Sequence, residues 1–432
     1  MKKVKWMIGM LTLMSATAFF VNCGGNDSNN SDPVALTLFS LTAGDADLNG
    51  ATSASDVAQD AAIVAVFSTE LDATSATSAN IVITNTTESM VVEADIKVSS
   101  TSITITPTTS FREGASFSIS FGSGLASSAG QTLSTMVTRT FSINGILVPD
   151  GQVAYWNFNE SNAKDQQGTN DGTEVSMTYV DGRSVDAGKA AKFDGDKSII
   201  EIPDGDLLID GADFTLSFWM KTESENHVDA NGNNVGHFVI GLGAFYGIQY
   251  EVFGNYDGAK FAIRYEATDA STGAATTVTE DMWFPSLATD AATGGWQGWD
   301  YARSVTADDM AALYLKDVWT QVVYTYDGVE KQGTLYYNGE KMKSVDFDLW
   351  PDGDTKRSVA GLKYGGVAPE VVNELAFGFI QSRGGTLWDT ESWGGYDFTT
   401  ANHFKGQLDD IRIFHNALTA AQITALYQSE KS

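Results

Sequence analysis

The sequence predicts an all-β protein made of two consecutive β-sandwiches, with a short helix at the C-terminal end. Short runs in which apolar and polar residues alternate recur along the chain, and Gly, Asn and Asp separate them, as in antiparallel sheets packed face to face. The aromatic composition changes near residue 148. All fifteen tyrosines, all four histidines and all but one of the ten tryptophans follow that point. We therefore expect a first domain at 34–147 and a larger one at 148–432.

The first 33 residues have the pattern of an export signal rather than of a folded element. Three lysines precede an apolar run at 6–21, and the only cysteine of the chain, Cys23, follows it. This segment resembles a bacterial lipoprotein signal. The resemblance implies a signal peptide at 1–22, lipid on Cys23, a polar tether at 23–33, and a surface-exposed outer-membrane lipoprotein of the cell envelope that contacts the membrane through its lipid alone. Phe20, Val21 and Asn22 depart from the usual residues before such a cysteine, so ordinary signal cleavage remains the alternative.

The charge of the chain narrows the classes of partner. It has 55 acidic and 26 basic residues and a formal net charge of −29. Binding to phosphate backbones needs a basic face, so we expect no nucleic-acid partner. With a single cysteine no intrachain disulfide forms, and burial and hydrogen bonds must stabilise the exported protein.

Residues 34–147 predict the first sandwich. Alternating runs such as Ile63–Phe67, Ile103–Ile105 and Phe117–Phe121 indicate about seven strands, the usual number for such a fold. The order of these runs, from Val66–Asp72 to Arg139–Phe141, resembles the bacterial Ig-like domains of the S-layer type (SbsA-like). That resemblance implies a spacer, and no aromatic or charged cluster in this region points to a binding site of its own.

Residues 148–432 predict the second sandwich. Alternation is clear in Ala154–Phe158, Phe214–Met220 and Trp319–Tyr326, which places Trp156, Trp219 and Trp319 in the core. Asn338-Gly339 predicts a two-residue hairpin, because both residues tolerate positive φ. Near the C-terminus Thr419 and Gln422 have the spacing of a capping box, ahead of Ile423, Leu426 and Tyr427 on a short helix that packs on the sandwich.

The order of motifs in this region resembles the laminin-G-like jelly roll of the concanavalin A-like lectin/glucanase superfamily. The resemblance implies a fold that serves lectins, adhesion modules and hydrolases alike. The segments that show this resemblance are Ala154–Glu160, Gly188–Gly195, Asp213–Lys221, Trp319–Val323, Leu335–Gly339 and Phe404–Phe414.

Two stretches, 267–316 and 383–403, are longer than this pattern needs and carry aromatic residues among Gly, Asp and Thr. A flat ring beside carboxylates or amides suits the apolar face and hydroxyl rim of a sugar. The alternative is that the rings pin long loops onto the sandwich. The candidate glycan-binding residues are Trp283, Trp296, Trp299, Tyr301, Trp388, Trp393 and Tyr396.

A structural calcium ion is a further expectation, since the resembled jelly rolls include calcium binders and the segment 165–172 is rich in oxygen ligands. Asp165 and Asp171 are its candidate ligands, with Asp409 or Asp410 approaching if the first and last strands pair. For Asp194, before a glycine, capping a hairpin turn is the favoured role. Asp410 and Arg412, two residues apart on a strand, would share a sheet face, where they could belong to a structural ion pair.

The sequence predicts binding without catalysis. Retaining glucanases of this fold alternate carboxylates along one strand, and no Glu-x-Asp-x-Glu run is present. The four histidines are scattered and suggest neither a zinc site nor a triad. We expect a surface protein that binds a glycan or polysaccharide. The alternatives are a module that adheres to surface proteins and, less favoured, a glycoside hydrolase whose site forms only in three dimensions.

Overall fold

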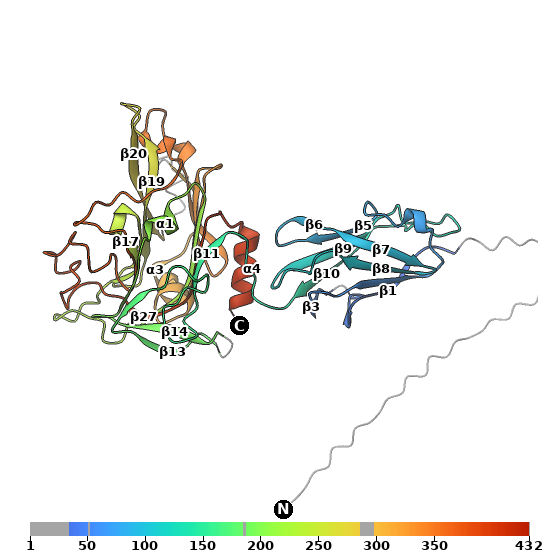
Figure 1. Cartoon of the computed structure of the whole chain (residues 1–432), viewed down its shortest axis with the longest axis horizontal. Coiled ribbons are helices and arrows are strands. Elements are labelled where there is room, and N and C mark those ends of the chain that lie inside the picture. The colour runs from blue at the N-terminus through green and yellow to red at the C-terminus, as the bar shows by residue number, and fades with distance from the viewer. Residues whose placement is uncertain (1–33, 51, 185–186, 286–297, 432) are drawn as a thin grey trace, which may run out of the picture.

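The computed structural model describes residues 34–50, 52–184, 187–285 and 298–431. Two β-sandwiches follow one another along the long axis, with helix α4 between them (Figure 1). Cys23 and Trp296, for which lipidation and ligand binding are predicted, lie outside the described residues. No helix in the described part of the chain is long and apolar enough to cross a membrane.

The first sandwich consists of two five-stranded sheets, in the orders β2-β1-β4-β8-β7 and β3-β10-β9-β5-β6. Ten strands therefore form instead of the expected seven or so, because short edge pieces such as β2 and β6 have no alternating apolar run. The strands are β1 (Leu38–Ala43), β2 (Ala46–Asp47), β3 (Ala54–Val57), β4 (Ile63–Phe67), β5 (Ile81–Asn85), β6 (Met90–Val92), β7 (Ala94–Ser99), β8 (Ser102–Pro107), β9 (Ser116–Phe121) and β10 (Val137–Ile143), with a helical turn η1 (Ala73–Ser75).

The second sandwich is larger, and its paired strands are all antiparallel. One sheet has nine strands, in the order β13-β14-β27-β16-β22-β23-β24-β21 with β11 paired to β27. The strands of this nine-stranded sheet are β11 (Gln152–Trp156), β13 (Thr178–Asp181), β14 (Lys189–Asp194), β16 (Phe214–Thr222), β21 (Trp299–Ala302), β22 (Thr320–Asp327), β23 (Gln332–Tyr337), β24 (Glu340–Asp346) and β27 (Lys405–Phe414).

The other sheet has eight strands, in the order β12-β15-β26-β17-β18-β19-β20 with β25 paired to β19. Its strands are β12 (Thr173–Val175), β15 (Ile199–Ile202), β17 (His237–Leu242), β18 (Ile248–Val252), β19 (Ala259–Thr268), β20 (Ala275–Phe284), β25 (Gly361–Leu362) and β26 (Leu375–Phe377). Helices and helical turns connect the strands at α1 (Asp206–Ile209), η2 (Ala244–Tyr246), α3 (Ala307–Met310), η3 (Ala311–Leu315), η4 (Phe347–Leu349) and η5 (Thr355–Ser358).

Aromatic side chains fill the space between these two sheets. Trp156 is fully buried, as predicted, and its ring meets Phe377 edge-on at 5.1 Å. The hydroxyls of the buried residues Tyr250 and Tyr337 form a hydrogen bond of 2.9 Å between the two sheets. Trp319 differs from the prediction, because it lies one residue before β22 and is only half-buried.

The hairpin at Asn338-Gly339 forms as predicted, whereas the turn that Asp194 caps connects β14 to β15 in the other sheet and is not a hairpin. Asn338 and Gly339 have φ of 51° and 77° and join β23 to β24. Asp194 caps its turn by accepting backbone N–H bonds from residues 196–198 at 2.9 to 3.0 Å. The Asn338-Gly339 turn fixes the register of β23 against β24, and the Asp194 turn carries the chain from one sheet to the other.

Helix α4 (Ala420–Glu430) begins with the predicted capping box of Thr419 and Gln422. It covers the outer face of the nine-stranded sheet, where Ile423 and Leu426 are buried in a cluster with the sheet residue Val323. Its other side meets the first sandwich, because Ala425 packs against that core and Ser429 Oγ accepts the Leu147 N–H at 3.2 Å. The helix therefore packs on both domains.

The stretch 267–316 is less irregular than its composition suggests. Strands β19 and β20 pair over their full length and form a hairpin that projects from the body (Figure 1). The half of β20 that lies in the projecting hairpin is rich in Thr and lacks a regular apolar alternation. The sequence therefore does not predict a strand there. Within residues 383–403, by contrast, the chain makes turns without a strand or helix.

Candidate functional site

The outer face of β18, β19 and β20, called the β18–β20 face below, carries a row of facing side chains. Glu251 pairs with Lys260, and Lys260 pairs in turn with Trp283. Directly opposed residues of an antiparallel ladder point to the same side. Their sequence neighbours Tyr250 and Phe261 belong to the core. Because side chains alternate along a strand, the row points away from the core.

Polar and aromatic groups of this row hold one another in place. Lys260 Nζ lies 3.1 Å from Glu251 Oε1 and 5.3 Å from the centre of the Trp283 ring. The Phe253 ring lies beside the indole, with 5.1 Å between centroids. Trp283 nevertheless remains 50% exposed. The result is a fixed aromatic surface next to charged hydrogen-bonding groups.

The neighbouring row of facing residues contributes the side-chain amide of Gln249 to this face. Gln249 lies opposite Ala262, and Ala262 lies opposite Asp281. Gln249 is only 3% exposed, and its amide nitrogen donates to Glu251 Oε2 at 3.1 Å. Glu251 thus has an ion-pair partner in Lys260 and a hydrogen-bond donor in Gln249, which together fix the orientation of its carboxylate.

A long loop, residues 379–403, covers the rest of the same sheet. A Cβ on Gly241 would clash with the Ile380 carbonyl, so the loop backbone lies directly over β17. Phe379 and Ile380 are buried there against outward-facing Phe238. The loop thereby borders the β18–β20 face on the β17 side.

The aromatic residues predicted in this loop have two roles. Trp388 and Tyr396 are half-buried against the small cluster under the loop, which agrees with the loop-packing alternative. Trp393 is 42% exposed, and its ring stands edge-on to Phe238 at 6.3 Å and 4.9 Å from Trp388. Trp393 therefore exposes an aromatic surface at the border of the β18–β20 face.

A pocket of about 330 Å³ lies beside the loop and is lined by Arg383, Asp389, Tyr396 and Asp397 among others. Arg383 Nη2 pairs with Glu201 Oε2 at 2.6 Å. Burial alone would raise the pKa of Glu201, but hydrogen bonds from Arg383 and Ser382 lower it below its usual range. Burial raises the pKa of Tyr396 to about 12. At neutral pH Glu201 is therefore ionised and Tyr396 carries its proton.

Trp299 and Tyr301 lie on the other sheet, on edge strand β21. Trp299 packs partly into the core, and Lys343 Nζ sits 3.5 Å from its ring centre and donates to the Trp283 carbonyl at 2.8 Å. Tyr301 is 40% exposed, with Lys341 Nζ 5.2 Å from its ring centre. Trp283 and Trp299 thus meet through Lys343 where the two sheets approach, whereas Tyr301 belongs to a different surface.

The three candidate calcium ligands are not brought together. Asp165 is fully buried and accepts the N–H groups of Tyr155 and Gln167 at 2.9 Å, and Asp171 accepts the N–H of Asp165. Asp409 instead pairs with Arg183 at 2.7 Å. In the described ranges no group of three His, Cys, Asp or Glu residues is placed to hold a metal ion. Calcium binding stays a prediction without an assembled ligand set.

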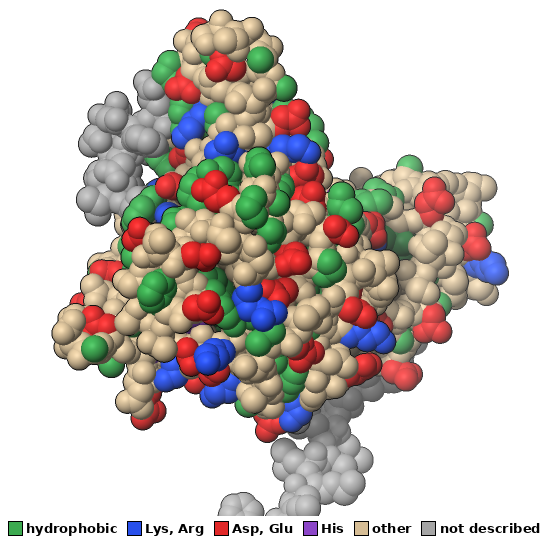
Figure 2. All heavy atoms as spheres, turned by 60° about the vertical axis from the view of Figure 1, so that its left-hand side comes forward, with side chains coloured by type: hydrophobic (Ala, Val, Ile, Leu, Met, Phe, Trp, Pro, Cys, Tyr) green, Lys and Arg blue, Asp and Glu red, His purple; other side chains and the backbone are tan. Residues whose placement is uncertain are grey.

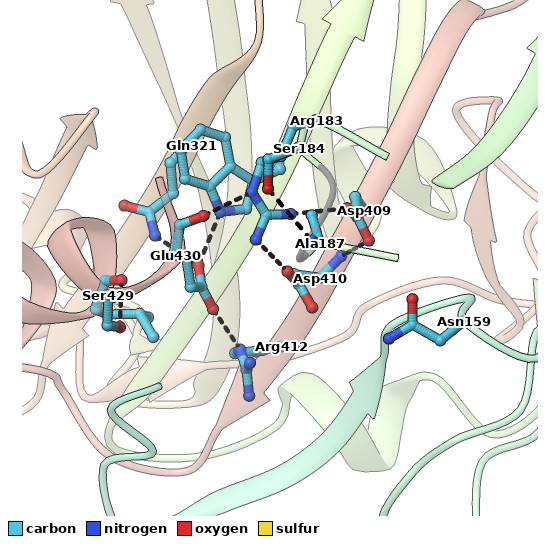
Figure 3. Close-up of polar contacts among 12 residues, drawn as sticks. Asn159, Arg183, Ser184, Ala187, Gln321, Asp409, Asp410, Arg412, Ser429 and Glu430 are labelled. Carbon is cyan, nitrogen blue, oxygen red and sulfur yellow. Dashed lines mark hydrogen bonds and ion pairs between the residues drawn. The ribbon is translucent and has the colours of Figure 1, made fainter. Parts of the chain in front are cut away.

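A buried ionic cluster lies under the end of α4 (Figure 3). Arg183 spans Asp409 and Asp410, at 2.7 and 2.6 Å, while Arg412 pairs with Glu430 at 3.0 Å. Asp410 and Arg412 both contact Tyr155, so they share a face of β27 as predicted, but each forms its ion pair with another residue. A bulge between β16 and β27, with a φ of 44° at Asp410, interrupts the alternation there, and Arg183 reaches the carboxylates of both Asp409 and Asp410.

Electrostatic interactions within this cluster stabilise the packing of α4 on the sheet. Burial, together with repulsion from Asp410, raises the pKa of Asp409 to about 9 despite the opposing effect of Arg183. Burial also raises the pKa of Glu430, which accepts from the Trp219 indole N–H at 2.7 Å. These groups satisfy one another and tie α4 to the sheet. A pocket of about 410 Å³ beside them reaches residues 144–146 of the first domain.

Two histidines that looked scattered in the sequence are neighbours in space. The rings of His227 and His237 lie 4.3 Å apart, and His237 Nε2 is 2.9 Å from the Tyr256 hydroxyl. Burial lowers the pKa of both, so each is neutral at pH 7. His227 lies in a turn ten residues before His237, and no sequence pattern signals that the turn folds back.

Comparison with known proteins gives one family match and several distant structural ones. Residues 46–143 match the bacterial Ig-like domain family. No curated protein sequence matches the chain significantly. Domain 4 of an extracellular arabinanase from Geobacillus stearothermophilus, solved with arabinotriose, is 19% identical, with a TM-score of 0.34 over 64% of this chain and 98% of that one.

Toxin binding domains are also similar at low identity. That of Paraclostridial Mosquitocidal Protein 1 is 14% identical, with a TM-score of 0.40 over 65% of this chain and 52% of that one. That of botulinum neurotoxin DC, solved with SialylT, is 12% identical, with a TM-score of 0.36 over 65% and 52%. The match spans about half the length of these toxin domains. The chain thus carries a bacterial Ig-like domain over residues 46–143, followed by a larger two-sheet β-sandwich.

Proposed function

We propose that the chain binds carbohydrate through the β18–β20 face, with Trp283 as the stacking surface. The observation that carries this proposal is the row of Glu251, Lys260 and Trp283, in which a half-exposed indole adjoins an ion pair. A sugar ring presents an apolar C–H face and a rim of hydroxyls. Such a ring stacks on Trp283 while its hydroxyls exchange hydrogen bonds with the neighbouring carboxylate and ammonium groups.

The fixed geometry of these groups supports binding. Glu251 is held by Lys260 and Gln249, and the backbone carbonyl of Trp283 accepts a hydrogen bond from Lys343. Side chains that are already ordered lose little entropy when a ligand arrives, which favours affinity. Trp393 at the β17 border gives an extended glycan a second ring to contact.

Adhesion to a protein partner is the second candidate, and the surface composition favours it less. A stable protein interface is centred on a contiguous apolar patch. Figure 2 shows hydrophobic side chains in small groups among acidic, basic and uncharged ones on the side of the molecule that it presents. This mixed surface suits a ligand rich in hydroxyl groups.

We propose binding without turnover. Glycoside hydrolysis needs a carboxyl that carries a proton at working pH. Near the proposed site, Arg383 and Ser382 lower the pKa of Glu201, and Glu251 contacts Lys260 and Gln249, while Asp409 and Glu430, whose pKa values are raised, are buried in the ionic cluster under α4. The test is the release of reducing ends from any bound glycan during prolonged incubation. None is expected, and steady release would show that the site is catalytic.

A glycan array with residues 34–432 tests the proposed function. Selective binding is expected, and Trp283→Ala should abolish it. Tyr301→Ala is the matched control, because Tyr301 is also a half-exposed ring below a lysine but lies on the other sheet. Running the array with calcium and with chelator tests the proposed structural ion. A blank array in both conditions would contradict glycan binding.

For its cellular setting we propose a lipid-anchored surface protein of the cell envelope. The basic start, the apolar run and Cys23 support the anchor, and the Ig-like domain would act as the spacer. The second sandwich would belong to the laminin-G-like jelly rolls, as the order of its motifs suggests. Labelling of cells with a fatty-acid analogue should mark the wild type but not Cys23→Ala. Equal labelling of the two would refute the anchor.

A further inference from the structure

Arg264 is a cation on the β18–β20 face that has no acidic partner. It projects from β19 opposite Thr279 on β20. Its Nε donates to Thr277 Oγ1 and its Nη1 to Thr279 Oγ1, both at 2.8 Å. Thr279 Oγ1 in turn donates to the Phe245 carbonyl. The guanidinium is therefore held by neutral hydroxyls.

Other buried or half-buried arginines of this sandwich are paired with carboxylates. Arg183, Arg383 and Arg412 each pair with an acid at 3.0 Å or less. Within the described residues Arg264 makes no ion pair, although Glu266 and Asp281 lie on the same face two residues along each strand. Burial without a compensating acid lowers the pKa of Arg264. In a chain with a net charge of −29, a cation left unpaired is notable.

An aromatic ring and a backbone segment also lie beside the guanidinium. Its Cζ lies 5.7 Å from the centre of the Tyr246 ring, which stacks on Phe245 at 4.6 Å. A Cβ on Gly365 would come within 3.3 Å of Arg264 Nε and 3.2 Å of Thr277 Oγ1. The backbone at Gly365 therefore lies close to the guanidinium. No hydrogen bond from Nη2 is found to any described residue, which leaves its N–H groups for a ligand.

We propose that Arg264 is an anion subsite that binds the carboxylate of an acidic sugar. This inference rests on the proposed function and specifies the class of glycan. A planar guanidinium with free N–H groups matches a carboxylate in charge and geometry. Arg264 and Trp283 project from neighbouring strands of the same face, so one acidic oligosaccharide can meet both. Fixation by two threonines and an aromatic ring keeps the subsite formed before binding.

The test compares carboxylated glycans, both uronates and sialates, with the same glycans after reduction of the carboxyl to a neutral alcohol. Calorimetric titration of residues 34–432 should show at least tenfold tighter binding of one carboxylated glycan than of its reduced form. Arg264→Gln should remove that preference, so that the carboxylated glycan binds no more tightly than its reduced form. Arg303→Gln is the matched control, since Arg303 pairs with Glu340 on the other sheet, and it should keep the preference.

The outcomes separate the two proposals. Binding of reduced and acidic glycans with equal affinity, lost in Trp283→Ala, would overturn the anion subsite and leave glycan binding standing. A preference that survives in Arg264→Gln would also overturn the subsite. Absence of binding to every glycan of the panel would overturn both proposals. Circular dichroism and unfolding midpoints of each variant show whether a loss comes from misfolding.

Discussion

Arg412 and Glu430 form an ion pair of 3.0 Å in which the two side chains are 1% and 0% exposed, and it joins strand β27 to the last turn of helix α4. The pair is separated by only 18 residues but connects the central strand of a sheet with the helix that packs on both domains. Buried pairs of this kind give specificity of packing, since either partner alone is costly.

Removing Glu430 should therefore destabilise the second sandwich. Glu430→Ala removes the carboxylate partner of the buried Arg412 guanidinium, whose remaining acceptor is the Gln152 amide oxygen, and leaves the buried Trp219 indole N–H without its acceptor. We expect a loss of about 3 to 5 kcal/mol in the free energy of unfolding. Urea titration followed by tryptophan fluorescence measures it. The exposed Glu330→Ala is the control, expected within about 0.5 kcal/mol of wild type. Equal losses in the two variants would contradict the role of the pair.

The raised pKa of Asp409 predicts a dependence of stability on pH. A carboxyl whose pKa is higher in the folded state than in the unfolded state binds its proton more tightly when folded. Its contribution is present at low pH and is lost as the pH rises from about 4 towards the folded pKa of about 9. Asp409→Asn mimics the protonated form, so its stability relative to wild type should improve between pH 5 and pH 9. A difference that does not vary with pH would show that Asp409 does not hold this proton.

The Glu201–Arg383 pair should order the loop that borders the β18–β20 face. Glu201 accepts the Arg383 backbone N–H at 2.8 Å as well as its side chain. Arg383→Ala should speed amide hydrogen exchange within 383–403 while the strands of the sandwich keep their protection. Because Trp393 lies in this loop, glycan affinity should fall modestly too. Unchanged exchange in the loop would mean that the aromatic cluster alone orders it.

The contact of α4 with the first domain predicts a defined arrangement of the two sandwiches. Ala425 packs against the core of the first domain. Ala425→Glu should separate the domains and increase the maximum dimension seen by small-angle scattering, with little change in the unfolding of either one. Ala421→Glu, on an exposed position of the same helix, serves as the control. Identical scattering of the two variants would argue that this contact does not set the arrangement.

Local signals made much of the fold predictable. Alternation located most strands, Asn338-Gly339 located a hairpin, and Thr419 with Gln422 located the start of α4, because these patterns act within a few residues. The bulge at Asp410 was not predictable, since it depends on how β27 pairs with β16. Short edge strands such as β2 and β6 were not predictable, because they bury few side chains and so show no apolar alternation.

The candidate site was predictable only in part. Trp283 was identified as an aromatic residue in a polar stretch, yet it lies on a strand and not in a loop. Its neighbours Glu251 and Lys260 carry no signal in the sequence, because cross-strand register brings them to Trp283 from other parts of the chain. The same holds for Arg264, whose lack of an acidic partner becomes visible only when the surrounding strands are placed.

The most direct test of glycan binding at the β18–β20 face is the affinity of wild type, Trp283→Ala and Tyr301→Ala for the strongest ligand on the array, measured by calorimetric titration. We predict at least a tenfold loss in Trp283→Ala, which corresponds to about 1.4 kcal/mol, and wild-type affinity in Tyr301→Ala. Unchanged affinity in Trp283→Ala, with the loss found in Tyr301→Ala instead, would place the site on the other sheet and contradict the proposal.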